Sequence, residues 1–317
     1  MIKVAVVGAG AFGREHARVY SEIAGARLEA VCDTDESRGR SVAQHYGADF
    51  VQDYRQLIGR VSGVTVAVPT ESHQEISCQL LEAGIAVLIE KPIARTLDEA
   101  DQIIEAAKRG GSVLQTGHLE RFNPAVMAAS LILTRPRFFE AHRLSIFTPR
   151  SLDIDVVMDL MIHDLDVVLA FAGSEVSEVR AAGIPILTPR VDIANARIEF
   201  VNGCVANLTA SRVSADRVRK LRFFQPHQYI SLDYAVQEAA VVSVKTRPEG
   251  RPEFESRLLP VERAEPLRLE IESFLAAVGG SEVKVTGEDG RRALALAVDV
   301  SEKIREHAVR AGVLFAG

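Results

Sequence analysis

The sequence predicts an α/β protein with two domains: a doubly wound parallel sheet, then an α+β domain with a mostly antiparallel sheet. Up to His118, short β-branched runs alternate with amphipathic segments, which is typical of a parallel sheet. Beyond it, alternating strands follow one another through turn signals such as Val201–Cys204, which indicates hairpins. We therefore expect one domain over residues 1–119 and a second over residues 120–317.

The first domain is expected to contain five strands separated by four helices. Ile2–Gly8 is almost wholly apolar, as a strand covered on both faces should be. The helical segments carry apolar residues three or four positions apart. The other expected strands are Leu28–Asp33, Gly63–Pro69, Ile85–Pro92 and Ser112–His118, and the helices are Gly10–Glu22, Glu36–Tyr46, Ser72–Ala83 and Leu97–Lys108.

The second domain is expected to hold a helix at Asp155–Gly173, a run of strands, and two closing helices. The strands alternate apolar and polar residues, so each should bury one face. The expected strands are Arg137–Phe147, Val176–Ile184, Asp192–Phe200, Val205–Arg212, Lys220–Gln225, Tyr229–Asp233 and Ala239–Val244, and the closing helices are Pro266–Val278 and Asp289–Ala311.

Composition narrows the class of protein. The chain has 317 residues and a net charge of -6, which argues against a nucleic-acid partner because such a partner usually needs a basic face. Three scattered cysteines suit a reducing compartment. There is no basic leader and no run of about 18 apolar residues, so we expect a cytoplasmic protein that does not enter a membrane.

A glycine loop follows the first strand. Gly8, Gly10 and Gly13 have the GxGxxG spacing, between a buried strand and a helix. Such glycines permit a tight turn, a close approach to a pyrophosphate and close helix–strand packing, with the phosphates at the helix N-terminus. The context predicts a dinucleotide site, although a methyltransferase loop would use similar glycines.

An acidic residue completes this pattern. Asp33 lies 20 residues after Gly13, at the end of the next strand, where its carboxylate would accept hydrogen bonds from the adenosine ribose. A carboxylate there repels a 2′-phosphate, and the nearest cations, Arg38 and Arg40, lie further into the helix. We therefore expect NAD rather than NADP.

The sequence Glu90-Lys91-Pro92 ends a strand, at the edge where open α/β sheets bind ligands. Proline after lysine stops the strand, so Lys91 could point into a crevice near a nicotinamide. A lysine that merely caps the strand at the surface is the alternative.

The helix at Asp155–Gly173 is apolar yet carries four aspartates and a histidine. Asp155, Asp159 and His163 are four residues apart and share one stripe, which Asp166 continues. Asp164 lies off this stripe and is expected to be solvated.

The Asp159–His163 pair has the spacing of a proton-transfer site or of a metal site. A metal would need a third ligand that the sequence does not indicate, so we expect none. A pair that satisfies itself at a domain interface is the other alternative. In a chain with a nicotinamide site, proton removal from an alcohol is favoured.

These motifs together resemble the glucose–fructose oxidoreductase/inositol dehydrogenase (Gfo/Idh/MocA) family over nearly the whole chain. The resemblance implies a Rossmann domain joined to an open-faced sheet, with Lys91, Asp159 and His163 at the reaction centre. It also implies a homodimer or homotetramer formed through the sheet. The expected cofactor-binding residues are Gly8, Gly10, Ala11, Phe12, Gly13, Asp33, Pro69, Thr70, His73, Glu90 and Lys91.

Two stretches, Gly117–Val126 and Ala206–Phe224, are similar to those of family members that oxidise the 3-hydroxyl of UDP-N-acetylglucosamine on the way to the diamino sugar of lipid A. Such a substrate needs cations for its diphosphate. Arg217–Arg222 could serve this purpose, or could form a charged sheet face or a subunit contact. The expected substrate-binding residues are Lys91, Arg121, Asn123, Asp159, His163 and Arg212, with Arg217 and Arg219 as further candidates.

Two other functions stay open. The same catalytic set could oxidise a free polyol or sugar such as inositol. The chain could also be a nicotinamide-binding regulator without turnover, although sensing needs only the cofactor site. His163 is expected to take the hydroxyl proton, Asp159 to orient the imidazole, and Lys91 to polarise the oxygen, although the lysine and the histidine could exchange roles.

Overall fold

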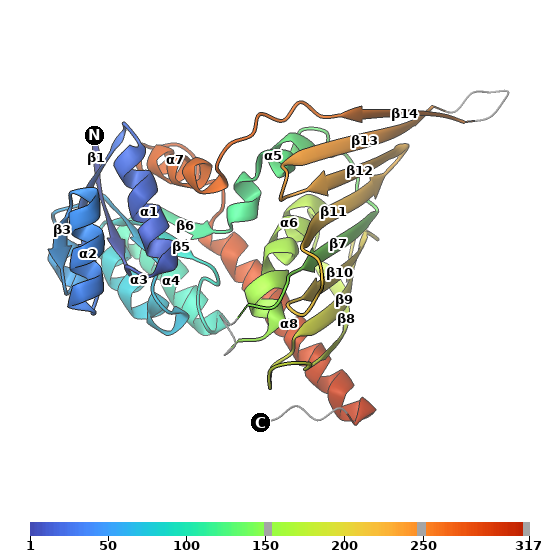
Figure 1. The fold of residues 1–317 in the computed structure, drawn as a ribbon, viewed down its shortest axis with the longest axis horizontal. Coiled ribbons are helices and arrows are strands. Elements are labelled where there is room, and N and C mark those ends of the chain that lie inside the picture. Colours follow the sequence, from blue (N-terminus) through green and yellow to red (C-terminus); the bar gives the residue numbers. More distant parts are fainter. Residues whose placement is uncertain (149–153, 246–251, 313–317) are drawn as a thin grey trace. The chain divides into compact units, whose positions relative to one another are not determined.

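The structure, a computed structural model, describes residues 1–148, 154–245 and 252–312 (Figure 1). None of the helices in these ranges combines the length and the apolarity that a membrane span requires.

The chain forms two compact units. The first comprises Met1–Leu119 and Glu265–Leu294, and the second comprises Glu120–Ala264 and Ala295–Gly317. The boundary expected after residue 119 coincides with the first passage between units. The expectation for Glu265–Leu294 is wrong, because this segment belongs to the first unit.

The first unit is built on a six-stranded parallel sheet with the order β3-β2-β1-β4-β5-β6. The order reverses beside β1, so the loops after β1 and β4 diverge there, as at the ligand crevice of a doubly wound sheet. Its strands are β1 (Ile2–Val7), β2 (Ala26–Cys32), β3 (Asp49–Val51), β4 (Gly63–Val66), β5 (Ala86–Glu90) and β6 (Leu114–Gly117). Its helices in the N-terminal segment are α1 (Ala11–Glu22), α2 (Glu36–Tyr46), α3 (His73–Glu82) and α4 (Leu97–Gly110).

Helix α7 (Pro266–Val278) belongs to the core of this first unit. Its Ile271 and Phe274 are fully buried and join the cluster that includes Val19 and Tyr20 of α1. A Cβ at Gly63 would lie 3.1 Å from the Phe274 ring, which shows how closely the helix approaches β4. Amphipathic spacing predicts that this segment is a helix, but it cannot tell which core the helix joins.

The second unit is built on an eight-stranded sheet with the order β14-β13-β12-β11-β7-β10-β9-β8. Among the described strands, only the β7–β10 pair is parallel, so the sheet is mostly antiparallel as expected. Its strands are β7 (Phe138–Leu144), β8 (Val176–Ile184), β9 (Ile193–Phe200), β10 (Val205–Ser211), β11 (Val218–Gln225), β12 (Gln228–Asp233), β13 (Glu238–Lys245) and β14 (Glu253–Leu258).

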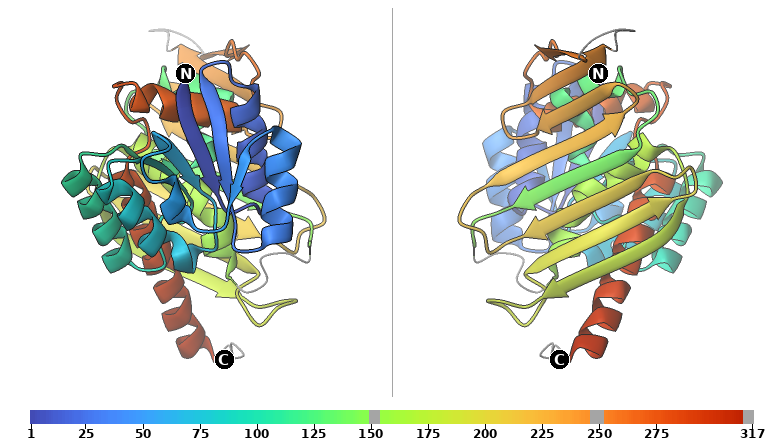
Figure 2. Two further views of the ribbon diagram at one scale, coloured as in Figure 1. Left: turned by 90° about the vertical axis from the view of Figure 1, so that its left-hand side faces the viewer. Right: turned by 90° about the vertical axis from the view of Figure 1, so that its right-hand side faces the viewer.

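Helices of this unit cover one face of the sheet (Figure 1). They are α5 (Pro124–Ser130), α6 (Ile162–Ala172) and the second part of α8 (Gly287–Ala311), a helix that runs through both units. No described helix of the unit covers the opposite face, which is seen in the right panel of Figure 2. Strands β3 and β14 and helix α5 were not expected from the sequence.

The open face carries an aromatic row formed by Phe138, Phe224 and Tyr229. The ring centroids of Phe138 and Phe224 are 5.9 Å apart, and those of Phe224 and Tyr229 are 5.0 Å apart. Phe224 is 39% exposed. A monomeric protein seldom leaves grouped aromatic rings in water.

Candidate active site

The glycine loop has the geometry that its sequence predicts. Gly8 adopts a φ of 98°, and a Cβ there would lie 2.4 Å from the carbonyl oxygen of Ala67. A Cβ on Gly13 would lie 1.7 Å from the carbonyl oxygen of Gly8. Gly10 differs, because a Cβ there would meet no atom within 4 Å. The backbone at Gly10 therefore faces open space at the N-terminus of α1, as phosphate binding requires.

Asp33 ties this loop to the end of β2. Its carboxylate accepts hydrogen bonds from the N–H of Ala9 at 2.7 Å and of Asp35 at 2.8 Å. Arg38 donates through Nε at 3.0 Å and Nη2 at 2.7 Å. Burial raises the pKa of Asp33, but the bonds from Arg38 and the two backbone groups outweigh burial and lower this pKa below its usual value.

Arg38 therefore lies nearer to Asp33 than the sequence predicts. It was expected further into the helix, yet it forms a two-point contact with the carboxylate. Because the arginine is on the first turn of α2 and half-exposed, its side chain can swing over the β2 end. A ribose that binds Asp33 must share this carboxylate with Arg38.

Two loops of the first unit carry the other expected cofactor residues. Pro69 and Thr70 begin the short turn after β4, Glu90 ends β5, and Lys91 follows it. His73 lies between the two loops and is 1% exposed. One ring nitrogen is 3.0 Å from the carbonyl oxygen of Val68, and the other is 3.1 Å from that of Pro92. Burial lowers the pKa of His73 despite these contacts, so this residue fixes the loops as a largely neutral ring.

In the second unit, Asp159 lies in a π-helical turn, Val157–Met161, that leads into α6. His163 is in the first turn of α6, and both side chains are partly exposed. Such widened turns are rare and often mark functional sites. The helix expected from Asp155 to Gly173 is present from this turn onward, and Gly173 ends it with a φ of 55°.

The aspartates of this helix differ from the even stripe that an α-helix predicts. Asp155 precedes the helix, and its Oδ1 accepts hydrogen bonds from the N–H groups of Val157 and Met158 at 3.0 and 2.9 Å. Asp166 is 2% exposed and contacts Arg121 Nη1 at 3.4 Å. Asp159 and His163 both keep exposed surface that suits a substrate, whereas the Asp155 carboxylate is bonded to the backbone of the turn and Asp166 is buried.

A pocket of the second unit adjoins Asp159. It has a volume of about 270 Å³ and lies beside the end of β7 and the start of β11. Three arginines that the sequence singled out share it, although they are separated from Asp159 by more than fifty residues. The lining residues are Ser145, Ile146, Thr148, Asp159, Leu160, Arg212, Arg217 and Arg219.

Arg212 is held firmly at this pocket. It is 5% exposed, and its Nη2 donates to the carbonyl oxygen of Ile154 at 2.7 Å. Its Nε lies 3.8 Å from Oδ1 of the fully buried Asp192. Arg219, on β11, and Arg217, in the turn before this strand, also reach the pocket. The pocket is therefore positively charged and suits an anionic ligand.

Family domains account for most of the chain. An oxidoreductase family domain with an NAD-binding Rossmann fold matches residues 2–118, and a GFO/IDH/MocA C-terminal domain matches residues 126–225. The UDP-N-acetylglucosamine 3-dehydrogenase of Acidithiobacillus ferrooxidans is 37% identical over 94% of this chain and 96% of its own length. This chain belongs to the Gfo/Idh/MocA oxidoreductase family.

Other relatives agree with this assignment. The inositol 2-dehydrogenase of Rhizobium meliloti is 25% identical over 93% of this chain and 94% of its own length. A solved structure of the Acidithiobacillus ferrooxidans enzyme superposes with a TM-score of 0.90 at 35% identity, covering 96% of this chain and 98% of that one. As a Gfo/Idh/MocA protein, the chain is an NAD-dependent oxidoreductase, and its open Gly10 backbone and Asp33 fit that cofactor.

Two expected substrate residues of this Gfo/Idh/MocA protein have other contacts. Arg121 bonds Asp166, as described above. Asn123 is 3% exposed and caps α5 through the N–H of Ala125 at 3.1 Å. Its amide nitrogen also donates to Glu120 Oε2 at 3.2 Å and to the carbonyl oxygen of Tyr234 at 3.0 Å. Because these bonds engage the side chain of Asn123 within the protein, Asn123 is not part of the proposed substrate site.

The expectation that Asp164 is solvated is wrong. Asp164 is 3% exposed and forms a two-point ion pair with Arg143, at 2.7 and 3.1 Å. Arg143 also donates to Glu120 Oε1 at 3.0 Å. Asp164 is brought inside by the turn geometry around Asp159 and by a buried cation from β7. A helical-wheel projection of the sequence represents neither of these features. This network anchors α6 to the sheet.

Ser145 and Thr148 of the pocket were missed. Both are hydroxyl residues at the end of an expected strand, a place where ligand-binding side chains gather. That position was the available signal. Hydroxyls are common at strand ends, however, so the sequence gives no reason to prefer these two until the pocket brings them beside the arginines.

Proposed function

We propose that this Gfo/Idh/MocA protein is an NAD-dependent dehydrogenase that oxidises the 3-hydroxyl of UDP-N-acetylglucosamine. The observation that carries the proposal is the pocket in which Arg212, Arg217 and Arg219 adjoin Asp159. Guanidinium groups suit diphosphate oxygens, and a carboxylate suits sugar hydroxyls and imidazole. The 37% identity to an enzyme with this activity over nearly the whole chain supports the same substrate.

In the proposed reaction, His163 takes the proton of the 3-hydroxyl as the carbon loses a hydride. Asp159, four residues earlier, orients the imidazole and stabilises the imidazolium. Lys91 polarises the oxygen on which negative charge develops. Bound NAD supplies the hydride acceptor. Expected cofactor contacts come from the glycine loop with Ala11 and Phe12, from Asp33, and from the loops that hold Pro69, Thr70 and Glu90.

The test is NADH formation, followed by absorbance, with UDP-N-acetylglucosamine against a panel of polyols including inositol. We expect turnover with the nucleotide sugar and at least a hundredfold lower kcat/KM with free sugars, because they lack the diphosphate that the arginines bind. Substitution of both Arg217 and Arg219 by Gln should raise KM for the nucleotide sugar. Activity confined to polyols would refute the substrate assignment.

Oxidation of a free polyol is the second candidate. The inositol 2-dehydrogenase relative favours it, since the fold and the reaction type are shared. In that case the R217Q/R219Q protein would keep its KM for the polyol. A chain that binds NADH but turns over neither class of substrate would instead act as a nicotinamide-binding regulator.

We also propose that the protein is a cytoplasmic homo-oligomer, a dimer or a tetramer formed through the open face of the eight-stranded sheet. The aromatic row on that face supports a second copy of this chain as its partner. A 3-keto nucleotide sugar is a substrate for an aminotransferase, which would place the reaction before formation of a diamino sugar such as that of lipid A.

A further inference from the structure

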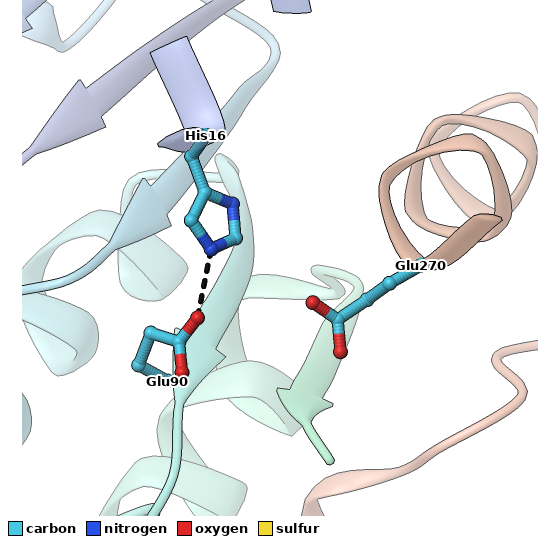
Figure 3. A group of neighbouring side chains, drawn as sticks. All are labelled: His16, Glu90 and Glu270. Atoms are coloured by element: carbon cyan, nitrogen blue, oxygen red, sulfur yellow. Dashed lines mark hydrogen bonds and ion pairs between the residues drawn. The ribbon is translucent and has the colours of Figure 1, made fainter. Parts of the chain in front are cut away.

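One cluster of titratable side chains in the first unit contains two residues, His16 and Glu270, that have no part in the function proposed above. It consists of His16 on α1, Glu90 at the end of β5 and Glu270 on α7 (Figure 3). One nitrogen or carboxylate oxygen from each lies within 4.8 Å of the others. His16 is 0% exposed and Glu270 is 1% exposed. We call these three residues the buried triad.

The contacts within the buried triad are unequal. His16 Nε2 and Glu90 Oε1 are 2.7 Å apart and share a hydrogen bond. Glu270 extends from α7 toward this pair, yet neither of its carboxylate oxygens has a hydrogen-bond partner among the described residues. An ionised carboxylate without a donor in such a place costs several kcal/mol. A second carboxylate close by adds repulsion between like charges.

The two glutamates therefore differ in charge. Burial, followed by the negative charge of Glu90, raises the pKa of Glu270 well above its usual range. Burial also raises the pKa of Glu90, but the hydrogen bond and charge of His16 and the charge of Lys91 outweigh it and lower that pKa. Two carboxyl groups pushed in opposite directions are the pattern of a neutral acid beside a carboxylate.

We propose that His16 and Glu270 are positioning residues for Lys91: His16 holds Glu90 as a carboxylate, and Glu270 remains a neutral acid beside it. The buried triad thus places one negative charge, and not two, next to the lysine. The role of Lys91 rests on the proposed function, whereas the protonation of Glu270 does not.

Other titratable groups face the buried triad from neighbouring elements. Lys91 follows Glu90, and His73 of α3 also lies within electrostatic range of Glu90. Tyr20 of α1 lies within electrostatic range of Glu270, and its hydroxyl contacts Thr65 Oγ1 at 2.9 Å. Burial raises the pKa of Tyr20, so this residue stays neutral over the range used below.

A neutral Glu270 has a consequence for stability. The unfolded chain loses this proton near pH 4.5, while the folded chain keeps it until the raised pKa is reached. Between those limits the folded state binds more protons, so its stability falls as the pH rises. Glutamine is the isostere of the neutral acid and has no proton to lose. The stability of E270Q relative to the native protein should therefore increase with pH.

The first experiment is thermal unfolding of the full chain between pH 5 and pH 8 in the presence of EDTA. We expect the Tm of E270Q to exceed that of the native protein by a margin that grows across this range. Glu272→Gln, on the exposed side of the same helix, is the matched control and should show a constant margin. A constant margin for E270Q as well would mean that Glu270 is ionised when folded, and would overturn the proposal.

The same three side chains have the chemistry of a divalent-metal site, so the ion itself is an arm of the test. Zn²⁺ or Mn²⁺ alone is titrated into the native protein and into E270Q without EDTA. We expect no stoichiometric binding that depends on Glu270. Binding of one ion per chain that is lost in E270Q would show that Glu270 is a metal ligand and not a neutral acid, and it would overturn the proposal.

The link to Lys91 is tested by the pH profile of kcat. Glu90→Gln removes the negative charge beside the lysine, so the limb that reports Lys91 should move to lower pH by about one unit. Glu270→Gln replaces one neutral group by another and should leave the position of that limb where it is. A merely structural role would lower kcat of E90Q at every pH without displacement. If no substrate is turned over, the proposed function fails, while unfolding still decides the state of Glu270.

Discussion

Asp33 has two competing partners at the scale of single residues, because the cofactor ribose and Arg38 use the same carboxylate. We expect Asp33→Ala to weaken NAD binding by about 1.5–3 kcal/mol, the usual contribution of hydrogen bonds to a charged group, or roughly ten- to a hundredfold in KM. The same change releases Arg38, whose guanidinium can then bind a 2′-phosphate. The ratio of kcat/KM for NADP to that for NAD should rise.

The control for this change is D33A/R38A, in which the gain for NADP should disappear. Steady-state kinetics with both cofactors measures the ratio. An unchanged ratio in D33A would show that Arg38 does not reach the ribose.

His163 is the expected proton acceptor, so His163→Asn should lower kcat by about a hundred- to ten thousandfold while NADH affinity stays within about threefold. Fluorescence titration of NADH and initial rates measure the two quantities. His227→Asn is a suitable control because His227 is exposed, far along the sequence, and has a φ of 62°, which asparagine tolerates. Turnover that survives in H163N would assign the proton to another group, Lys91 first.

At the scale of elements, two glycines of the glycine loop have different roles. Gly13 permits close packing, whereas Gly10 permits the ligand to approach the backbone. Gly10 has a φ of -68° and open space beside it, so Gly10→Ala should fold normally but obstruct the pyrophosphate. Gly13→Ala should lower the free energy of unfolding by about 1–3 kcal/mol, since its Cβ would overlap the carbonyl of Gly8. Urea unfolding and NADH titration of both variants test this contrast. G10A that binds NADH normally would contradict the assigned phosphate position.

Much of this architecture could be predicted from the sequence. The glycine spacing, the β-branched runs and the strand–helix alternation are local signals, and they predicted five of the six strands of the first sheet, all but β3. The membership of α7 could not be predicted, because Phe274 packs on Gly63, more than two hundred residues away. The burial of Asp164 depends on Arg143 of β7, and the role of Glu270 depends on Glu90. Such pairings become visible only when both elements are in place.

At the scale of the whole molecule, the open face of the eight-stranded sheet predicts self-association. Phe224→Lys introduces a charge into the aromatic row, and we expect it to shift a dimer or tetramer toward monomer in sedimentation velocity experiments. Val309→Lys, at an 83% exposed position of α8, is the control and should leave the sedimentation coefficient unchanged. An F224K protein that sediments like the native oligomer would place the subunit contact elsewhere.

The passage of the chain between its two units has a consequence during synthesis. The first unit is complete only when Glu265–Leu294 has been made, because α7 supplies Ile271 and Phe274 to its core. At about 5–20 residues per second, the six-stranded sheet waits roughly ten to thirty seconds after residue 119 for this helix. The segment 120–264 of the second unit is in effect an insertion within the first, and the apolar surface that α7 covers stays exposed while that insertion is translated. A ribosome-bound chain of this protein is therefore a natural client for chaperones that shield apolar surface.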